Sequence, residues 1–127
     1  MNCMQPGYSI PSSSSKNLYF CIVTDKNHIL QLIKTTVENT DPGAKVVLFG
    51  SYARGDYNEE SDIDLLILLD KEAITYKDRT RFTYPLFMLE IKTGISISPM
   101  IHSKDFWENK HKTTPFYENV NQEGIVL

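Results

Sequence analysis

Two short apolar runs in the middle of the chain limit the fold more than any other feature. Residues 45–49 (KVVLF) and 63–69 (IDLLILL) are rich in branched aliphatic side chains, and each is shorter than a typical helix. We expect both to be buried strands, and the second to be central in its sheet because nearly all of its side chains are apolar. Apolar residues at helical spacing flank them over residues 25–40 and 77–92. This order predicts an α/β (α+β) domain with a small mixed β-sheet backed by helices.

The remaining segments complete this small domain. Residues 50–55 predict a tight turn with one helical turn, and residues 104–110 and 115–122 predict two short helices. A third strand is expected over residues 95–101, where Pro99 makes it an edge strand or one interrupted near its end. The predicted core combines helical positions with C-terminal aromatic residues: Ile29, Leu32, Ile33, Val37, Phe82, Leu86, Met88, Leu89, Phe106, Trp107, Phe116 and Tyr117.

Composition and charge exclude several classes of protein. The chain has 127 residues and a net charge of -3 at pH 7, which suits one domain that bulk charge does not hold on nucleic acid or an anionic membrane. Cys3 and Cys21 form neither a metal-spaced pair nor a disulfide scaffold. No apolar run approaches the roughly 20 residues of a membrane span. We therefore predict a soluble, cytoplasmic domain over residues 23–127, preceded by a flexible N-terminal extension over residues 1–22.

Acidic residues are concentrated between the two predicted central strands. Asp or Glu occupies positions 56, 59, 60, 62 and 64. Such a run is either a solvated loop or a divalent cation site, because carboxylates repel one another and a metal ion relieves that repulsion. Asp62 and Asp64 begin the second strand, so alternation points both carboxylates to one face and Ile63 to the other.

Gly50 and Ser51 stand where the first strand passes into the predicted helical turn. Glycine lets the backbone approach a ligand closely, N–H groups at the start of a helix bind phosphate, and a serine hydroxyl adds a contact. Two carboxylates beside such a turn are what Mg²⁺ held between a protein and a triphosphate requires. The joint pattern therefore favours a cation and triphosphate site over a solvated loop.

The block from residue 49 to residue 69 resembles the signature of the DNA polymerase β-like nucleotidyltransferase superfamily, and in particular its minimal nucleotidyltransferases. That signature is an apolar residue followed by Gly-Ser, about ten further residues, and Asp-x-Asp leading into an apolar strand. Gly50, Ser51, Asp62 and Asp64 match it, and residues 52–55 (YARG) match a common elaboration of it. The resemblance covers about residues 25–127.

The resemblance implies an activity and a set of site residues. The reaction is the transfer of a nucleoside monophosphate, AMP in the favoured case, from an NTP to a hydroxyl, with pyrophosphate leaving. Asp62 and Asp64 are the catalytic carboxylates and hold two Mg²⁺ ions in the active state. Gly50, Ser51 and Arg54 bind the nucleotide phosphates, with ATP as the expected substrate.

One departure from the family pattern concerns a third carboxylate, which active members place on the next strand. Ser96 occupies about that position, and serine is neither a base at neutral pH nor a good metal ligand. Glu90, Asp56 or a partner protein could supply the missing group. The alternative is a catalytically impaired nucleotide-binding domain that acts as a binding module for a partner protein.

The expected partner is a separate acceptor molecule, because the chain has no room for an acceptor-binding domain. By resemblance, minimal nucleotidyltransferases pair with a small helical protein as the antitoxin of a toxin–antitoxin module, and some attach AMP to a tyrosine of the toxin. Others belong to systems that modify small molecules, so a small-molecule acceptor remains open. No membrane partner and no strong nucleic-acid binding are expected, and an oligomer is an open possibility.

Overall fold

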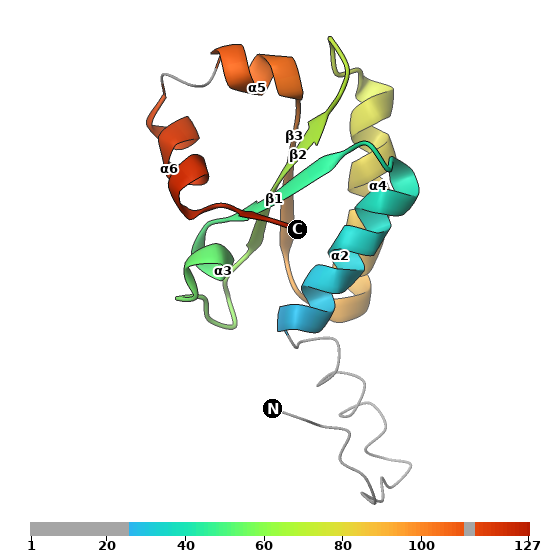
Figure 1. Ribbon diagram of the computed structural model, residues 1–127. Helices are drawn as coiled ribbons and strands as arrows, with labels where there is room; N and C mark the ends of the chain where they lie inside the picture. Colours follow the sequence, from blue (N-terminus) through green and yellow to red (C-terminus); the bar gives the residue numbers. More distant parts are fainter. Residues whose placement is uncertain (1–25, 111–113) are drawn as a thin grey trace, which may run out of the picture.

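The computed structural model describes residues 26–110 and 114–127, as a small mixed sheet with helices on both faces (Figure 1). The predicted extension over residues 1–22 lies outside these residues. The elements follow the predicted order: α2 (Lys26–Thr40), β1 (Lys45–Phe49), α3 (Ser51–Arg54), β2 (Ile63–Leu69), α4 (Tyr76–Thr93), β3 (Ile97–Ser103), α5 (Lys104–Lys110), α6 (Pro115–Glu123) and β4 (Ile125–Val126).

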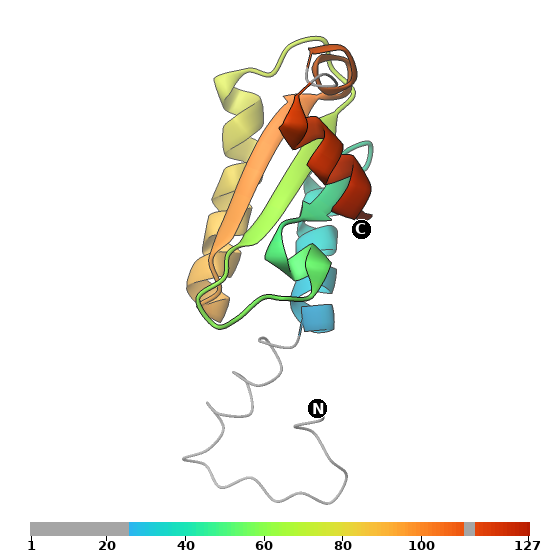
Figure 2. The same cartoon turned by 90° about the vertical axis from the view of Figure 1, so that its left-hand side faces the viewer.

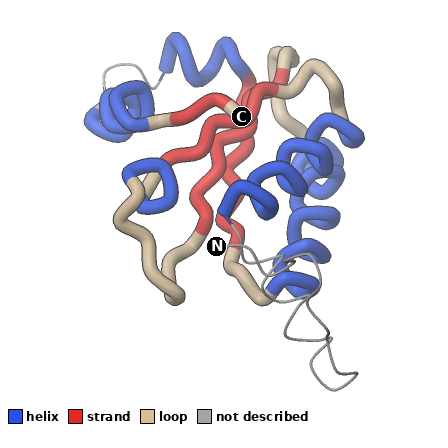
Figure 3. The backbone as a smooth tube through the Cα atoms, turned by 60° about the horizontal axis from the view of Figure 1, so that its bottom comes forward, coloured by secondary structure: helices blue, strands red, loops and turns tan. Residues whose placement is uncertain are grey.

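The sheet has four strands in the order β3-β2-β1-β4. Strand β1 runs antiparallel to both β2 and β4, whereas β2 and β3 are parallel and are joined through α4. Figure 3 shows the strands side by side with helices flanking them. As predicted, β2 is central, and every one of its residues except Asp64 is buried.

Two apolar clusters cover the two faces of the sheet. Helices α2 and α4 lie against one face, and α5 and α6 lie against the other (Figures 1 and 2). Odd-numbered β2 residues such as Leu65 and Ile67 pack in the first cluster, while Leu66 and Leu68 pack with Trp107 in the second. Because side chains alternate along a strand, Asp64 shares the face of Leu66 and Leu68. Asp64 therefore lies on the α5–α6 side of the sheet.

The outer edge of β3 is occupied by side chains of α4. Ile63 donates its N–H to the carbonyl of Ser96 (2.8 Å), so the backbone groups of the next residue, Ile97, face away from β2. Glu90 accepts a hydrogen bond from the N–H of Ile97 (2.7 Å), and Arg79 donates to the carbonyl of Ile101 (3.2 Å). Pro99, between them, has no N–H. The prediction that Pro99 lies on an edge strand is confirmed.

The structure corrects three details of the sequence analysis. Strand β3 covers Ile97–Ser103 and so begins two residues later than the predicted range. Met88 and Phe106, predicted to lie in the core, are 46% and 42% exposed. Met88 follows the helical spacing of an outer stripe on α4 that also exposes Tyr84, Phe87 and Ile91, and apolar spacing alone does not say which stripe is buried.

The other predicted core residues are buried or packed against the core, including Trp107, which is 2% exposed. Across residues 26–110 and 114–127, no helix combines the length and the apolar character that crossing a bilayer requires.

Candidate active site

Gly50 and Asp64 meet because of the register between β1 and β2. Phe49 pairs with Asp64, so Gly50, the next residue, emerges from β1 against the Asp64 carboxylate. A Cβ atom placed on Gly50 would overlap Asp64 Oδ2, and the φ angle of Gly50 is 76°. Both the left-handed backbone and the close approach require glycine at this position.

The turn after Gly50 is a single turn of helix, as predicted. The N–H groups of Ala53 and Arg54 donate to the carbonyl of Gly50 at 3.0 and 3.1 Å. Gly55 ends α3 in the left-handed conformation (φ 88°) and donates its N–H to the carbonyl of Ser51. Ser51 begins α3, is partly buried, and directly follows the residue that contacts Asp64.

Asp62 and Asp64 lie on the face that alternation predicts. Ile63 is fully buried between them, whereas Asp62 is exposed and Asp64 is partly buried. Burial raises the pKa of the Asp64 carboxyl, and the negative charge of Asp62 raises it further, while Arg54 opposes both effects. A cation between the two carboxylates would relieve this repulsion.

Arg54 is held by two acidic residues on opposite sides of the turn. Its Nε donates to Asp56 at 3.3 Å and its Nη1 donates to Glu123 at 3.2 Å. The hydrogen bond from Asp56 is the largest cause that raises the pKa of Arg54. Glu123 Oε1 also accepts a hydrogen bond from the N–H of Gly50 (3.3 Å). A carboxylate therefore contacts two groups that the sequence assigns to phosphate binding.

Ser98 is the residue of β3 that lies directly beside Asp64. The parallel register pairs Asp64 with Ser98, and paired residues share one face of the sheet. Ser96, the predicted position of the third carboxylate, lies one residue before β3, and its carbonyl accepts from Ile63. Both residues are serines, so no carboxylate stands at either position.

The two acids considered as replacements have other partners. Glu90 bonds to the outer edge of β3, away from β2, and Asp56 pairs with Arg54. Within residues 26–110 and 114–127, no three His, Cys, Asp or Glu side chains come close enough together to hold a metal ion. Two carboxylates still suit Mg²⁺, which binds through one or two protein carboxylates plus substrate phosphates and water. The residues present therefore fit a magnesium ion that arrives with a triphosphate.

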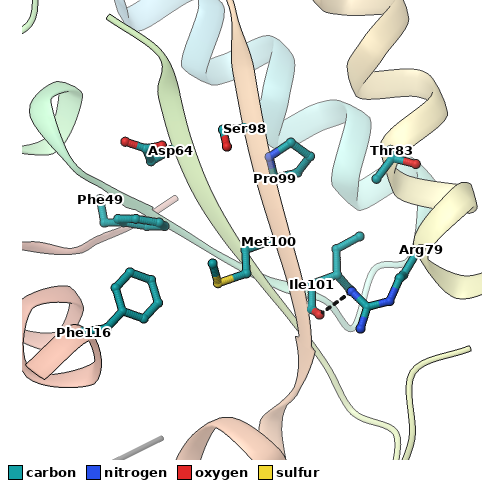
Figure 4. Close-up of a pocket in the computed structure, with 9 residues that line it drawn as sticks. All are labelled: Phe49, Asp64, Arg79, Thr83, Ser98, Pro99, Met100, Ile101 and Phe116. Atoms are coloured by element: carbon teal, nitrogen blue, oxygen red, sulfur yellow. Dashed lines mark hydrogen bonds between the residues drawn. The ribbon is translucent and has the colours of Figure 1, made fainter. Parts of the chain in front are cut away.

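An open hollow of about 360 Å³ extends from Asp64 along the sheet. Figure 4 shows Asp64 and Ser98 at one end, with Phe49, Phe116 and Met100 further along the same side. The rings of Phe49 and Phe116 pack edge to face, with centroids 5.4 Å apart. The carboxylate pair thus borders a largely apolar hollow that could receive part of a substrate.

Tyr52 and Tyr57 stack on each other instead of standing apart in the loop. Their ring centroids are 4.2 Å apart with planes 13° from parallel. Burial, and secondarily Tyr57, raises the pKa of Tyr52. Both rings line a second hollow of about 550 Å³ that includes neither Gly50 nor Asp64. The stack braces the loop between α3 and β2.

The structure brings together four of the predicted site residues, and the sequence missed two neighbours. Gly50, Ser51, Arg54 and Asp64 lie around the turn, and Asp62 is on the same face as Asp64. Glu123 was missed because it is 73 positions from Gly50 and carries no motif. Ser98 could have been identified from alternation, since it shares a strand face with Ser96.

Comparisons with known proteins agree with this geometry. A family model described as a nucleotidyltransferase domain matches residues 30–114. Two proteins of Methanocaldococcus jannaschii, each named "Putative protein adenylyltransferase", are 42% identical to the chain over 83 and 86 residues, which is 65% of this chain and 77% and 76% of those proteins. A solved structure titled "Crystal structure of the toxin-antitoxin with AMP-PNP" has a TM-score of 0.52 at 18% identity, and the match covers 80% of this chain and 71% of that chain.

The chain therefore belongs to the nucleotidyltransferase-domain family, and its fold is the polymerase β-like fold of that family. It is an enzyme of the nucleotidyltransferase class, for which a nucleoside triphosphate is the substrate. The family, the fold and the enzyme class expected from the sequence are confirmed.

Replacing Gly50 by alanine should disable the site, whereas the same change at Gly55 should not. Both glycines have positive φ, so each substitution should cost about 1–2 kcal/mol of backbone strain. Only the methyl group at position 50 overlaps Asp64, because nothing lies within 4 Å of a Cβ at position 55. Calorimetric titration with a magnesium–nucleoside triphosphate should show about tenfold or greater loss of affinity for Gly50→Ala alone. Equal losses in both variants would contradict the assigned role of the Gly50–Asp64 contact.

Asp64 and Asp78 should respond oppositely to neutralisation. The pKa of Asp64 is raised by burial and Asp62, so the folded state binds this proton more tightly and stability falls as pH rises from the ordinary pKa through the raised one. Asp64→Asn should therefore raise Tm by about 1–3 °C at pH 7, with the gain shrinking below about pH 4.

Asp78 provides the matched comparison within the same domain. A hydrogen bond from Lys71, followed by one from the Thr75 backbone, lowers its pKa, so the stability that Asp78 contributes is present above its unfolded pKa and is lost only in strong acid. Asp78→Asn should lower Tm at pH 7. Thermal melts at pH 3 and pH 7 check both signs, and a lower Tm for Asp64→Asn at pH 7 would contradict the repulsion described here.

Proposed function

We propose that this protein transfers AMP from ATP to a hydroxyl group on a separate protein. The observation that carries the proposal is the contact of Asp64 with the Gly50 turn, which sets a carboxylate pair beside backbone N–H groups. The names of the two archaeal relatives, which designate protein adenylyltransferases, support the choice of AMP and of a protein acceptor.

The proposal gives each residue of the turn a separate task. Gly50 and Ser51 would bind the terminal phosphates through backbone N–H groups and the serine hydroxyl, and Arg54 would add a cationic contact. Asp62 and Asp64 would hold Mg²⁺, which lowers the charge of the α-phosphate and of the departing pyrophosphate. The hollow beside Asp64 would receive the side chain that carries the acceptor hydroxyl.

The proposal extends to the role of the protein as the antitoxin of a toxin–antitoxin pair, with a small helical toxin as the acceptor. The structural neighbour is titled as a toxin–antitoxin crystallised with AMP-PNP, a non-transferring analogue of ATP. The sequence resemblance to minimal nucleotidyltransferases supports the same pairing. A protein partner is therefore the first acceptor to test.

A second candidate function follows from the serine beside Asp64. Ser98 cannot hold a metal ion as a carboxylate does, nor accept a proton from a hydroxyl at neutral pH. A domain with this defect would bind the nucleotide with little or no transfer and would act on its partner by binding alone. The two candidates differ in whether label moves to the acceptor.

Labelled nucleotide tests the first candidate directly. Incubation with α-labelled ATP, CTP, GTP and UTP, Mg²⁺ and lysate of the source cell should label a protein from ATP alone. The variant Asp62→Asn/Asp64→Asn should abolish labelling and should keep the fold, because neutralising the pair removes repulsion. Nucleotide binding without transfer under every condition would favour the second candidate. Normal binding of magnesium–ATP by the double variant would refute the site.

A carboxylate introduced on β3 tests whether the missing acid limits the reaction. Ser98→Asp places the group directly beside Asp64, whereas Ser96→Asp places it two residues away, before the strand begins. If the third carboxylate is the only defect, Ser98→Asp should raise the transfer rate by about tenfold to a hundredfold, and Ser96→Asp should raise it less. The rate constant of labelling measures both, and no change in Ser98→Asp would mean that the proton acceptor comes from elsewhere.

A further inference from the structure

Glu123 occupies the hydrogen-bond donors that the proposed function assigns to phosphate. One of its oxygens, Oε1, accepts from the N–H of Gly50 at 3.3 Å and from Nη1 of Arg54 at 3.2 Å. The side chain of Glu123 is 27% exposed, so this carboxylate is partly withdrawn from water. A single anionic oxygen on a backbone N–H and a guanidinium makes the same contacts as a phosphate oxygen would.

The position of Glu123 is unfavourable for the helix that carries it. Glu123 is the last residue of α6, where the unpaired carbonyl groups give the helix its negative end, and the last turn of α6 has no basic residue. The contacts with Gly50 and Arg54 offset this cost. The acid is therefore stabilised by the turn of the active site rather than by its own helix.

The backbone at residues 123–127 holds Glu123 above this turn. Gly124 donates its N–H to the carbonyl of Val120 (2.7 Å), and a Cβ on Gly124 would overlap that carbonyl and lie 2.7 Å from Val47. Ile125 pairs with Leu48 in the sheet. The end of α6 is thus fixed against β1, and the Glu123 side chain alone has to rotate for the donors to be released.

We infer that Glu123 is an internal anion that occupies the phosphate-binding donors of the empty site and that a triphosphate must displace. The inference rests on the proposed function, since it concerns the same donors. Two negative groups cannot share the Gly50 N–H and the Arg54 guanidinium without repulsion. Glu123 consequently competes with the nucleotide and sets its affinity, and binding of the triphosphate releases the side chain from the turn.

The test compares binding of magnesium–ATP and of magnesium tripolyphosphate to three variants by calorimetric titration at low salt. Glu123→Gln removes the charge but keeps an acceptor oxygen, Glu123→Ala removes both, and Glu118→Gln removes one charge from the exposed first turn of the same helix. Both Glu123 variants should bind about threefold to tenfold more tightly than the unmodified protein. The affinity of Glu118→Gln should change less than about twofold.

The outcomes separate this inference from the proposed function. Unchanged or weaker binding in Glu123→Gln, while the unmodified protein binds magnesium–ATP, would overturn the competition and would make Glu123 a residue that positions Arg54. An equal gain in Glu118→Gln would reduce the effect to net charge and would overturn it as well. Failure of every variant to bind either ligand would overturn the proposed function together with the inference. The gain should shrink in about 0.5 M salt, because exposed charges are screened there.

Discussion

The antiparallel register between β1 and β2 is the constraint on which the site depends. It pairs Phe49 with Asp64 and so sets Gly50 against the Asp64 carboxylate. The register is itself fixed by burial, because a slip of one residue would turn Leu66 and Leu68 out of their cluster and bring charged Asp64 to the α2–α4 face. The geometry of the site is therefore a property of the core, and the loop over residues 56–62 only has to connect α3 to β2.

Two carboxylates of this small domain show how burial can serve structure or chemistry. Asp78 lies within its hydrogen bonds to Lys71 and Thr75, which lower its pKa and complete the N-terminal cap of α4. The pKa of Asp64 is raised, because burial and Asp62 outweigh the distant help of Arg54. An acid that pays for its burial without local compensation is typical of a functional position, and this contrast agrees with the family assignment.

Much of this could be predicted from the sequence because the signals are local. Apolar runs and helical spacing gave β1, β2, α2 and α4, and the motif of Gly50, Ser51, Asp62 and Asp64 carried the site. What failed depends on tertiary contacts. The start of β3 was misplaced because Ile95 and Ser96 alternate like a strand but lie before its ladder, and Met88 belongs to an exposed stripe that has the same spacing as a buried one. Glu123 reaches Gly50 only because β4 returns to pair with β1.

The protected edge of β3 has a consequence for how another protein can approach. A chain that extended the sheet by strand addition would need the outward donor at Ile97 and the outward acceptor at Ile101, and both already bond to α4. Pro99 offers no donor between them. A polypeptide that delivers a side chain to Asp64 therefore has to descend onto the face of the sheet, through the hollow between Met100 and Phe116, and its selection depends on side-chain shape rather than on backbone pairing.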